Sequence, residues 1–236
     1  MKFIEILGFP GSGKSTLKEK INKKKLIFSL EYIFYQSLFS ENKNISLLQY
    51  KFLYYLNKKK FYDIAFDNYL RKKNYLANII KKKINHSNND FYKNNINLYN
   101  SYKKLLNFSS YSIIKKKRIL KRFVYFTGLY NFVKKKNKFR EYKILQDEGF
   151  YQKVFLNYKI ENKLVYLCIK RYFNSIPKGV KILFVDEKID VCIDRLSKRQ
   201  KYFNYKNIEL EKKIYLRIKK MLNKDYLNKR SKKIML

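Results

Sequence analysis

The first residues of the chain have the apolar pattern of a buried parallel strand. Residues 3–7 (Phe-Ile-Glu-Ile-Leu) are nearly all apolar, with Glu5 as the one charged position. Such a short continuous run is typical of a strand that is covered on both faces. It leads directly into a glycine-rich segment, after which the region from Ser15 to about Asn22 is predicted to be the first helix.

Later apolar runs predict the other strands of a sheet. A candidate second strand covers 26–30, a third begins at Tyr142 and ends in two acids and a glycine, and a fourth covers 180–185. The last residues, 233–236, predict a short edge strand. Strands separated by helical segments indicate an α/β fold.

Helical spacing dominates the region between the second and third strands. Asparagine-rich segments at 42–44, 85–89 and 94–97 predict its breaks, and His86 lies in one of them as a predicted solvated residue. The predicted helices of this region cover about 32–40, 45–57, 61–84, 90–107 and 110–135. The later predicted helices cover about 149–158 and 160–174, the segment after Asp186 with apolar positions 189, 192, 193 and 196, and about 207–228.

The segment Gly8-Phe-Pro-Gly-Ser-Gly-Lys-Ser fits the phosphate-binding pattern G-x-x-x-x-G-K-[ST]. Its glycines let consecutive backbone N–H groups surround a phosphate where a Cβ would intrude, and the dipole of the following helix attracts the anion. In this pattern Lys14 reaches the β- and γ-phosphates, Ser15 binds Mg²⁺ and Thr16 caps the α-phosphate. The predicted nucleotide-binding residues are Gly8, Pro10, Gly11, Ser12, Gly13, Lys14, Ser15 and Thr16.

Acidic residues at predicted strand ends are the candidates for metal and proton chemistry. Asp147, followed by Glu148, ends the third strand, where it can hold a water on Mg²⁺ or accept a proton from an attacking hydroxyl. Glu31 follows the second strand and is an alternative base, although it also suits the first turn of a helix. Capping of the next helix is the structural alternative for Asp147.

Two pairs of arginines are candidates for binding phosphate. Arg195 and Arg199 lie one turn apart after the fourth strand, where they can close over phosphates and neutralise charge in the transition state. Arg118 and Arg122 have the same spacing and can clamp an anionic acceptor. A salt-bridged or solvated helix face is the structural alternative for both pairs.

Composition bears on the expected partners. The chain has 236 residues, enough for one α/β domain, and a formal net charge of +38, which favours nucleic acid or an anionic membrane surface. An A+T-rich genome also produces abundant Lys, Asn, Ile, Tyr and Phe, and the lysine triplets are scattered rather than gathered in one stripe. Cys168 and Cys192 are predicted to be buried free thiols, and no Cys/His cluster predicts zinc. The absence of secretory and transmembrane patterns predicts a cytoplasmic protein.

Three segments resemble the P-loop nucleoside and nucleotide kinase superfamily, namely GFPGSGKST (8–16), ILQDEGF (144–150) and ILFVDEKIDVCIDRLSKR (182–199). The resemblance implies a three-layer P-loop NTPase fold with a mostly parallel sheet of order 2-3-1-4-5. It implies a single domain over 1–236, with a helical acceptor-binding insert at 32–140 and a lid at 186–205. The chain departs from several branches of the family because Glu-Gly, not Arg, follows Asp147, and because the fifth strand is shortened.

The expected function is therefore transfer of the γ-phosphate of Mg·ATP to a small hydroxyl- or phosphate-bearing acceptor. The resemblance implies Lys14, Asp147, Arg195 and Arg199 as catalytic residues, with Ser15 and Asp147 as the Mg²⁺ site, in part through water. A nucleic-acid-binding P-loop NTPase and a catalytically silent nucleotide-binding regulator are the alternatives. The acceptor is not predicted, because nothing diagnostic occurs in the helical insert.

Overall fold

The structure is a computed structural model that describes residues 2–24, 30, 31, 33, 34, 37, 74–136, 143–156, 158–199, 208–222 and 231–234. The chain forms two compact units. The first contains residues 1–27, 95–121 and 141–236, and the second contains 28–94 and 122–140. The expected insert at 32–140 therefore contributes residues 95–121 to the first unit.

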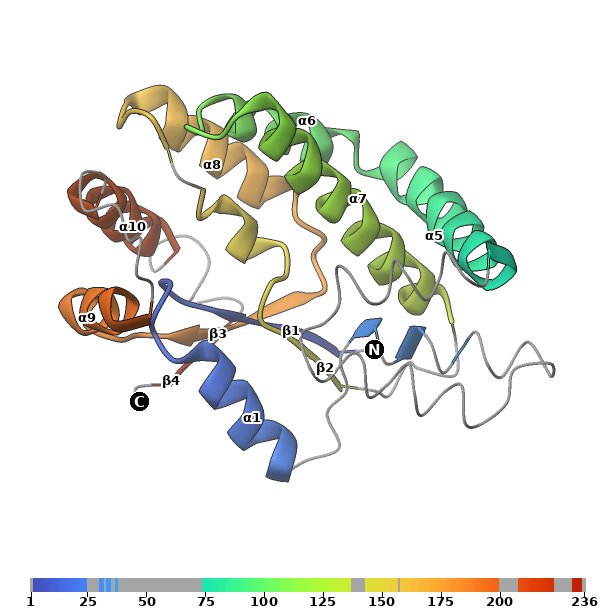
Figure 1. Ribbon diagram of the computed structural model, residues 1–236, viewed down its shortest axis with the longest axis horizontal. Coiled ribbons are helices and arrows are strands. Elements are labelled where there is room, and N and C mark those ends of the chain that lie inside the picture. Colours follow the sequence, from blue (N-terminus) through green and yellow to red (C-terminus); the bar gives the residue numbers. More distant parts are fainter. Residues whose placement is uncertain are drawn as a thin grey trace. The chain divides into compact units, whose positions relative to one another are not determined.

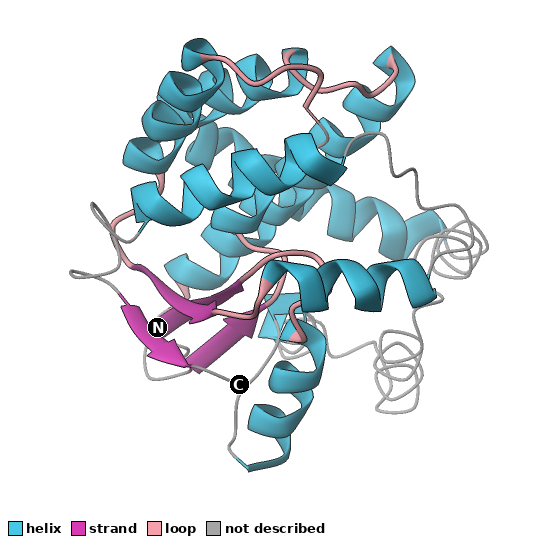
Figure 2. Ribbon diagram, turned by 90° about the vertical axis from the view of Figure 1, so that its left-hand side faces the viewer, coloured by secondary structure: helices cyan, strands magenta, loops and turns pink. Residues whose placement is uncertain are grey.

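A small parallel sheet forms the centre of the first unit (Figures 1 and 2). Its strands are β1 (Lys2–Leu7), β2 (Lys143–Gln146), β3 (Val180–Val185) and β4 (Ser231–Ile234). They lie in the order β2-β1-β3-β4, and each neighbouring pair is parallel. The first strand is thus internal, as its continuous apolar run predicts.

The α/β class with a parallel sheet is confirmed, whereas the five-strand order is not. The strands expected as third, first, fourth and fifth have the relative order that was predicted. The second expected strand, 26–30, is wrong at its end, because Leu30 is helical, and 26–29 lie outside the described residues. Leu30 and Glu31 instead fit the helix start that was the alternative interpretation of this segment.

Alternation along β1 gives the sheet two different faces. Ile6 packs with Leu145, Val185 and Leu17 of α1 (Lys14–Lys24), which lies on one side of the sheet (Figure 1). Phe3 points to the other face and meets Phe150, with 6.3 Å between the ring centres. Period-two alternation places Glu5 on this second face as well, where it is fully buried.

The helices of the first unit follow the predicted apolar spacing, with one exception. Only a single 3₁₀ turn forms within the helix expected at 149–158. Asn162 caps the N-terminus of α8 (Lys163–Ser175), because its side chain accepts a hydrogen bond from the Val165 N–H at 2.9 Å. The helices after α1 are α6 (Ile96–Asn107), residues 113–121 of α7 (Ile113–Lys135), the 3₁₀ turn η2 (Tyr151–Val154), α8 (Lys163–Ser175), α9 (Ile189–Arg199) and α10 (Ile208–Leu222).

In the second unit, the helix break predicted at 85–89 is wrong. Helix α5 (Asn74–Asn94) runs through this segment, and His86 is exposed on the helix rather than in a loop. The buried polar residues are held by α7, where Thr127 donates to Asn88 at 2.9 Å and Asn131 donates to the Ser87 carbonyl at 2.8 Å. These tertiary bonds outweigh the weak helix propensity of Ser and Asn.

Close approach of the two helices of this unit depends on Gly128. A Cβ at this position of α7 would lie 2.7 Å from the Ile84 carbonyl oxygen of α5.

Some of the predicted helices lie outside the described residues. These are the helix predicted at 45–57 and the part of the helix predicted at 61–84 that covers 61–73. Among the helices that are described, none has the length and apolar character needed to cross a membrane.

Candidate phosphate-binding site

The glycine-rich segment forms a tight loop between the central strand and the first helix. Gly11 and Gly13 have φ angles of 87° and 85°, in the left-handed region that residues with a Cβ rarely adopt. The Ser12 N–H donates to the Phe9 carbonyl at 3.0 Å, and the Leu17 N–H donates to the Gly13 carbonyl at 2.9 Å. The loop therefore turns sharply and passes at once into α1, whose N-terminus faces it.

Lys14 is folded back over this loop. Its ammonium donates to the carbonyls of Gly8 at 2.8 Å and Phe9 at 2.9 Å. Burial lowers the pKa of Lys14 to about 8, although the nearby Asp147 acts in the opposite direction. The loop thus contains a desolvated cation that an anion would stabilise.

Asp147 lies at the tip of β2, as predicted, and its partner is Lys18. The Lys18 ammonium is 2.8 Å from the Asp147 carboxylate, and both side chains are about three-quarters buried. Lys18 stands one helical turn after Lys14 on α1, so the ion pair joins this helix to the β2 tip. Glu148, the second candidate, is exposed and 3.9 Å from Lys153.

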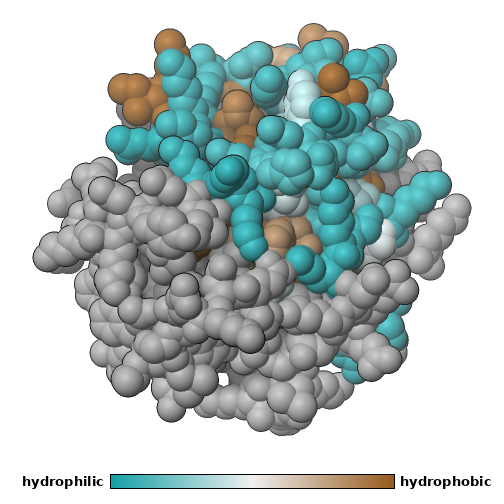
Figure 3. Space-filling view, turned by 90° about the vertical axis from the view of Figure 1, so that its right-hand side faces the viewer, coloured by the Kyte–Doolittle hydropathy of each residue, from teal (hydrophilic) through white to brown (hydrophobic). Residues whose placement is uncertain are grey.

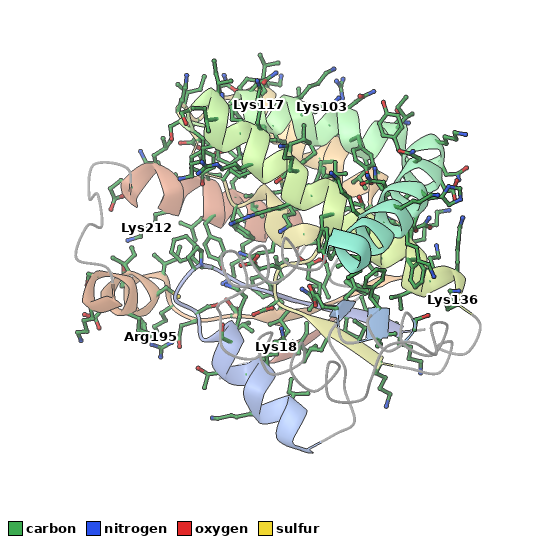
Figure 4. The ribbon with its side chains drawn as sticks, turned by 45° about the vertical axis from the view of Figure 1, so that its right-hand side comes forward. Lys18, Lys103, Lys117, Lys136, Arg195 and Lys212 are labelled. Atoms are coloured by element: carbon green, nitrogen blue, oxygen red, sulfur yellow. The ribbon has the colours of Figure 1, made fainter. Side chains whose placement is uncertain are left out.

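Arg195 reaches the loop from α9, as its place in the sequence predicts. Its guanidinium lies 3.1 Å from Glu187 and donates to the Gly11 carbonyl at 3.4 Å. Figure 4 shows Arg195 and Lys18 on either side of the loop, on α9 and α1. Arg199 is the last residue of α9, but its side chain and residues 200–205 of the predicted lid lie outside the described part of the chain.

Glu5 binds the backbone of the segment that follows the β2 tip. Its carboxylate accepts the N–H groups of Tyr151 at 2.8 Å and Gln152 at 2.6 Å. Gly149 permits this approach, because a Cβ there would lie 2.5 Å from a Glu5 oxygen. Burial raises the pKa of Glu5 to about 7 despite these hydrogen bonds and the nearby Lys153.

Helix α10 also packs against the loop, through an aromatic contact. The ring of Tyr215 lies 4.7 Å from that of Phe9, and the Lys219 ammonium pairs with Asp186 at the end of β3.

The two cysteines differ in their burial. Burial raises the pKa of the Cys192 thiol to about 11. Cys168 is only half-buried, so its prediction as a buried thiol is wrong.

The remaining predicted residues have diverse positions. Ser15 and Thr16 are exposed in the first turn of α1, and Pro10 is half-buried in the loop. Glu31 is half-buried in the second unit, and Arg118 and Arg122 are exposed on α7. Within the described residues, no group of three or more His, Cys, Asp or Glu side chains is arranged to hold a metal ion.

Sequence reasoning missed three residues of this site: Lys18, Glu187 and Glu5. Lys18 had a signal, since it lies four residues after Lys14 and so shares its helix face. Glu5 also had one, as a charge within a buried strand. Glu187 had none, because its pairing with Arg195 depends on how α9 leaves β3.

Comparison of the chain with protein-family models, with curated proteins and with solved structures gives no match in any of the three. The geometry of the loop and of the side chains around it is therefore the basis for a functional assignment.

Proposed function

We propose that the protein is an ATP-dependent phosphotransferase of the P-loop kinase type, acting on a small hydroxyl- or phosphate-bearing acceptor. The observation that carries the proposal is the loop between β1 and α1. Its two left-handed glycines, the internal position of β1 and the ammonium of Lys14 over the loop carbonyls together make an anion site.

The loop fits a polyphosphate in its chemistry as well as its shape. The Ser12 hydroxyl is buried and has no hydrogen-bond partner within the described part of the chain. The Lys14 ammonium donates to two backbone carbonyls of the loop, and burial lowers its pKa although Asp147 favours the charged form. A bound phosphate would supply the missing negative charge and hydrogen-bond acceptors.

Residues that would hold Mg²⁺ are also present. The Ser15 hydroxyl in the first turn of α1 and the Asp147 carboxylate at the β2 tip are oxygen ligands of the type that Mg²⁺ prefers. The ion commonly binds through one or two protein ligands, water and substrate phosphates, so a larger acidic cluster is not required. When bound, it would neutralise charge on the phosphate oxygens.

The side chains around the loop have complementary roles in this proposal. Lys14 and Arg195 place positive charge where negative charge grows during phosphoryl transfer. Asp147 would orient the acceptor hydroxyl and receive its proton, or would help to hold Mg²⁺, and Lys18 fixes the direction of its carboxylate. Glu187 positions Arg195, and Arg199 is proposed as the second lid arginine.

ATP binding and turnover by Lys14→Ala, compared with the wild type, test the proposal. Lys20→Ala is a matched control, because Lys20 is an exposed lysine of the same helix. We expect Lys14→Ala to weaken ATP binding by about tenfold or more and to abolish turnover, while Lys20→Ala retains both.

A screen of hydroxyl acceptors with labelled ATP then separates the candidate functions. Phosphate transfer to one acceptor class supports the kinase. Equal ATP affinity in Lys14→Ala and wild type would remove the basis of the proposal. Tight binding that depends on Lys14, without turnover on any acceptor, would favour the silent regulatory protein. Hydrolysis that rises steeply with added polynucleotide would favour the nucleic-acid-dependent NTPase.

A further inference from the structure

Several exposed aliphatic side chains gather at one end of the first unit. Ile113 and Ile114 in the first turn of α7 are 73% and 66% exposed. Ile160, in the segment before α8, and Leu164, in the first turn of α8, are 50% and 59% exposed. We call these four residues the aliphatic tip. Exposure of these branched apolar groups to water is unfavourable, and a patch of exposed apolar side chains at one place is typical of an interaction surface.

Backbone contacts hold the two halves of the aliphatic tip together. Ser109 and Tyr158 form an antiparallel bridge, and the Lys159 N–H donates to the Phe108 carbonyl at 3.0 Å. The segments that enter α7 and α8 are therefore paired directly before both helices begin. Figure 1 shows both helices beginning at the same end of the unit.

The surroundings of the tip are strongly basic. The sequence contains no acidic residue between Asp90 and Glu141, and Lys115, Lys117 and Arg118 directly follow the two isoleucines as exposed side chains. Figure 4 shows Lys117 at the upper edge of the molecule beside Lys103 of α6.

The α8 half is basic too. Lys159 and Lys163 are exposed beside Ile160 and Leu164. The one acid within 158–171, Glu161, accepts a hydrogen bond from the Tyr166 hydroxyl at 2.7 Å and lies 3.8 Å from Arg217. On the face drawn in Figure 3, the described surface is mostly hydrophilic, with apolar side chains along its upper edge.

We propose that the aliphatic tip and its surrounding lysines form a docking surface for the anionic phospholipid surface of a membrane. Aliphatic groups at the tip would enter the interface between head groups and acyl chains, while the lysines would bind the lipid phosphates and carboxylates. Contact of this kind lies on the bilayer and needs no spanning helix. The proposal is independent of the phosphotransferase activity.

The composition of the tip favours a lipid over the other polyanionic or apolar partners. Protein interfaces are depleted of lysine and enriched in aromatic residues at their centre, which is the reverse of this surface. Sites for single-stranded nucleic acid present aromatic rings for base stacking, whereas the four exposed residues here are aliphatic. Tyr111, the nearby aromatic, is covered by Lys115, with 4.1 Å between the ammonium and the ring centre.

Vesicle co-sedimentation of the full chain tests the proposal. We expect binding to vesicles of phosphatidylcholine mixed with phosphatidylserine, little binding to phosphatidylcholine alone, and weakening at high salt. The double variant Ile113→Ser/Ile114→Ser should bind at least about tenfold more weakly, because the apolar part of the contact is lost. Ile96→Ser is the control. Ile96 is 47% exposed at the start of α6, whereas the end of α6 leads into the tip, so this variant should leave binding unchanged.

The alternative outcomes would overturn the proposal. Equal binding of the double and control variants to anionic vesicles would show that general charge, not the tip, is responsible. Loss of RNA binding in the double variant without any vesicle binding would assign the tip to nucleic acid. A dimer that the double variant converts to monomer, again without vesicle binding, would assign it to self-association. Thermal unfolding of both variants checks that these exposed substitutions leave the fold intact.

Discussion

The Lys18 ammonium lies 2.8 Å from the Asp147 carboxylate, and this pair connects residues that are 129 positions apart in the chain. Lys18 belongs to α1, which follows the glycine-rich loop, and Asp147 directly follows the neighbouring strand β2. The pair thereby fixes the candidate acid relative to the candidate phosphate site. An acid held by a lysine one turn beyond the loop is a positioning arrangement that the motif alone does not specify.

The Lys18–Asp147 pair should matter for turnover more than for nucleotide affinity. We expect Lys18→Met to reduce ATP turnover by about tenfold and to change ATP affinity by less than about twofold, because Lys18 acts through Asp147. A double-mutant cycle with Asp147→Asn should give a coupling of about 1 kcal/mol in transition-state free energy. If Lys18→Met behaves like the exposed-site variant Lys20→Met, the positioning role is wrong.

Gly8 should be intolerant of a side chain. A Cβ at Gly8 would lie 2.6 Å from the Ser12 hydroxyl and 3.0 Å from the Val185 carbonyl oxygen of β3. We expect Gly8→Ala to lower the free energy of unfolding by about 1–3 kcal/mol and to abolish ATP binding. Urea unfolding measures the first effect. Gly179→Ala is the control, since nothing lies within 4 Å of its Cβ position, and it should be neutral or slightly stabilising.

Glu5 should make folding stability fall as the pH rises from 4.5 to about 7. Its pKa is raised to about 7 from 4.5, so over this range the folded state binds a proton that the unfolded state has lost. The contribution amounts to about 3 kcal/mol, most of it lost by neutral pH. The difference in unfolding free energy between wild type and Glu5→Gln, measured by urea unfolding at each pH, should follow this curve.

ATP affinity should fall as the pH rises through about 8. The pKa of Lys14 in the ligand-free protein is about 8, and bound phosphate would favour the ammonium form. The complex therefore carries more protons than the free protein above this pH, and affinity should drop by up to about tenfold per pH unit. Calorimetry at pH 8.5 in buffers of different ionisation enthalpy should detect proton uptake on binding. Uptake that persists in Lys14→Ala would assign the proton to another group.

Among the site residues, those on one continuous stretch were predictable and those defined by long-range pairs were not. Gly11, Gly13 and Lys14 follow from a strand–loop–helix pattern that is local. The positive φ angles of the two glycines and the place of Lys14 at the start of α1 match it. The break expected at 85–89 failed because a local signal, Ser and Asn, was outweighed by hydrogen bonds from Thr127 and Asn131 of α7. The role of Glu5 required knowing which N–H groups lie above its strand.

Local patterns in the sequence predict the α/β class, the internal strand β1, the loop over residues 8–13 and the helix that follows it, because apolar period and glycine positions act over a few neighbouring residues. Only the folded chain brings Lys18 to Asp147, places the Glu187–Arg195 pair beside the loop and lets Glu5 approach Gly149. Each of these joins different secondary structure elements, and the geometry of such pairs depends on how strands and helices pack rather than on any local pattern.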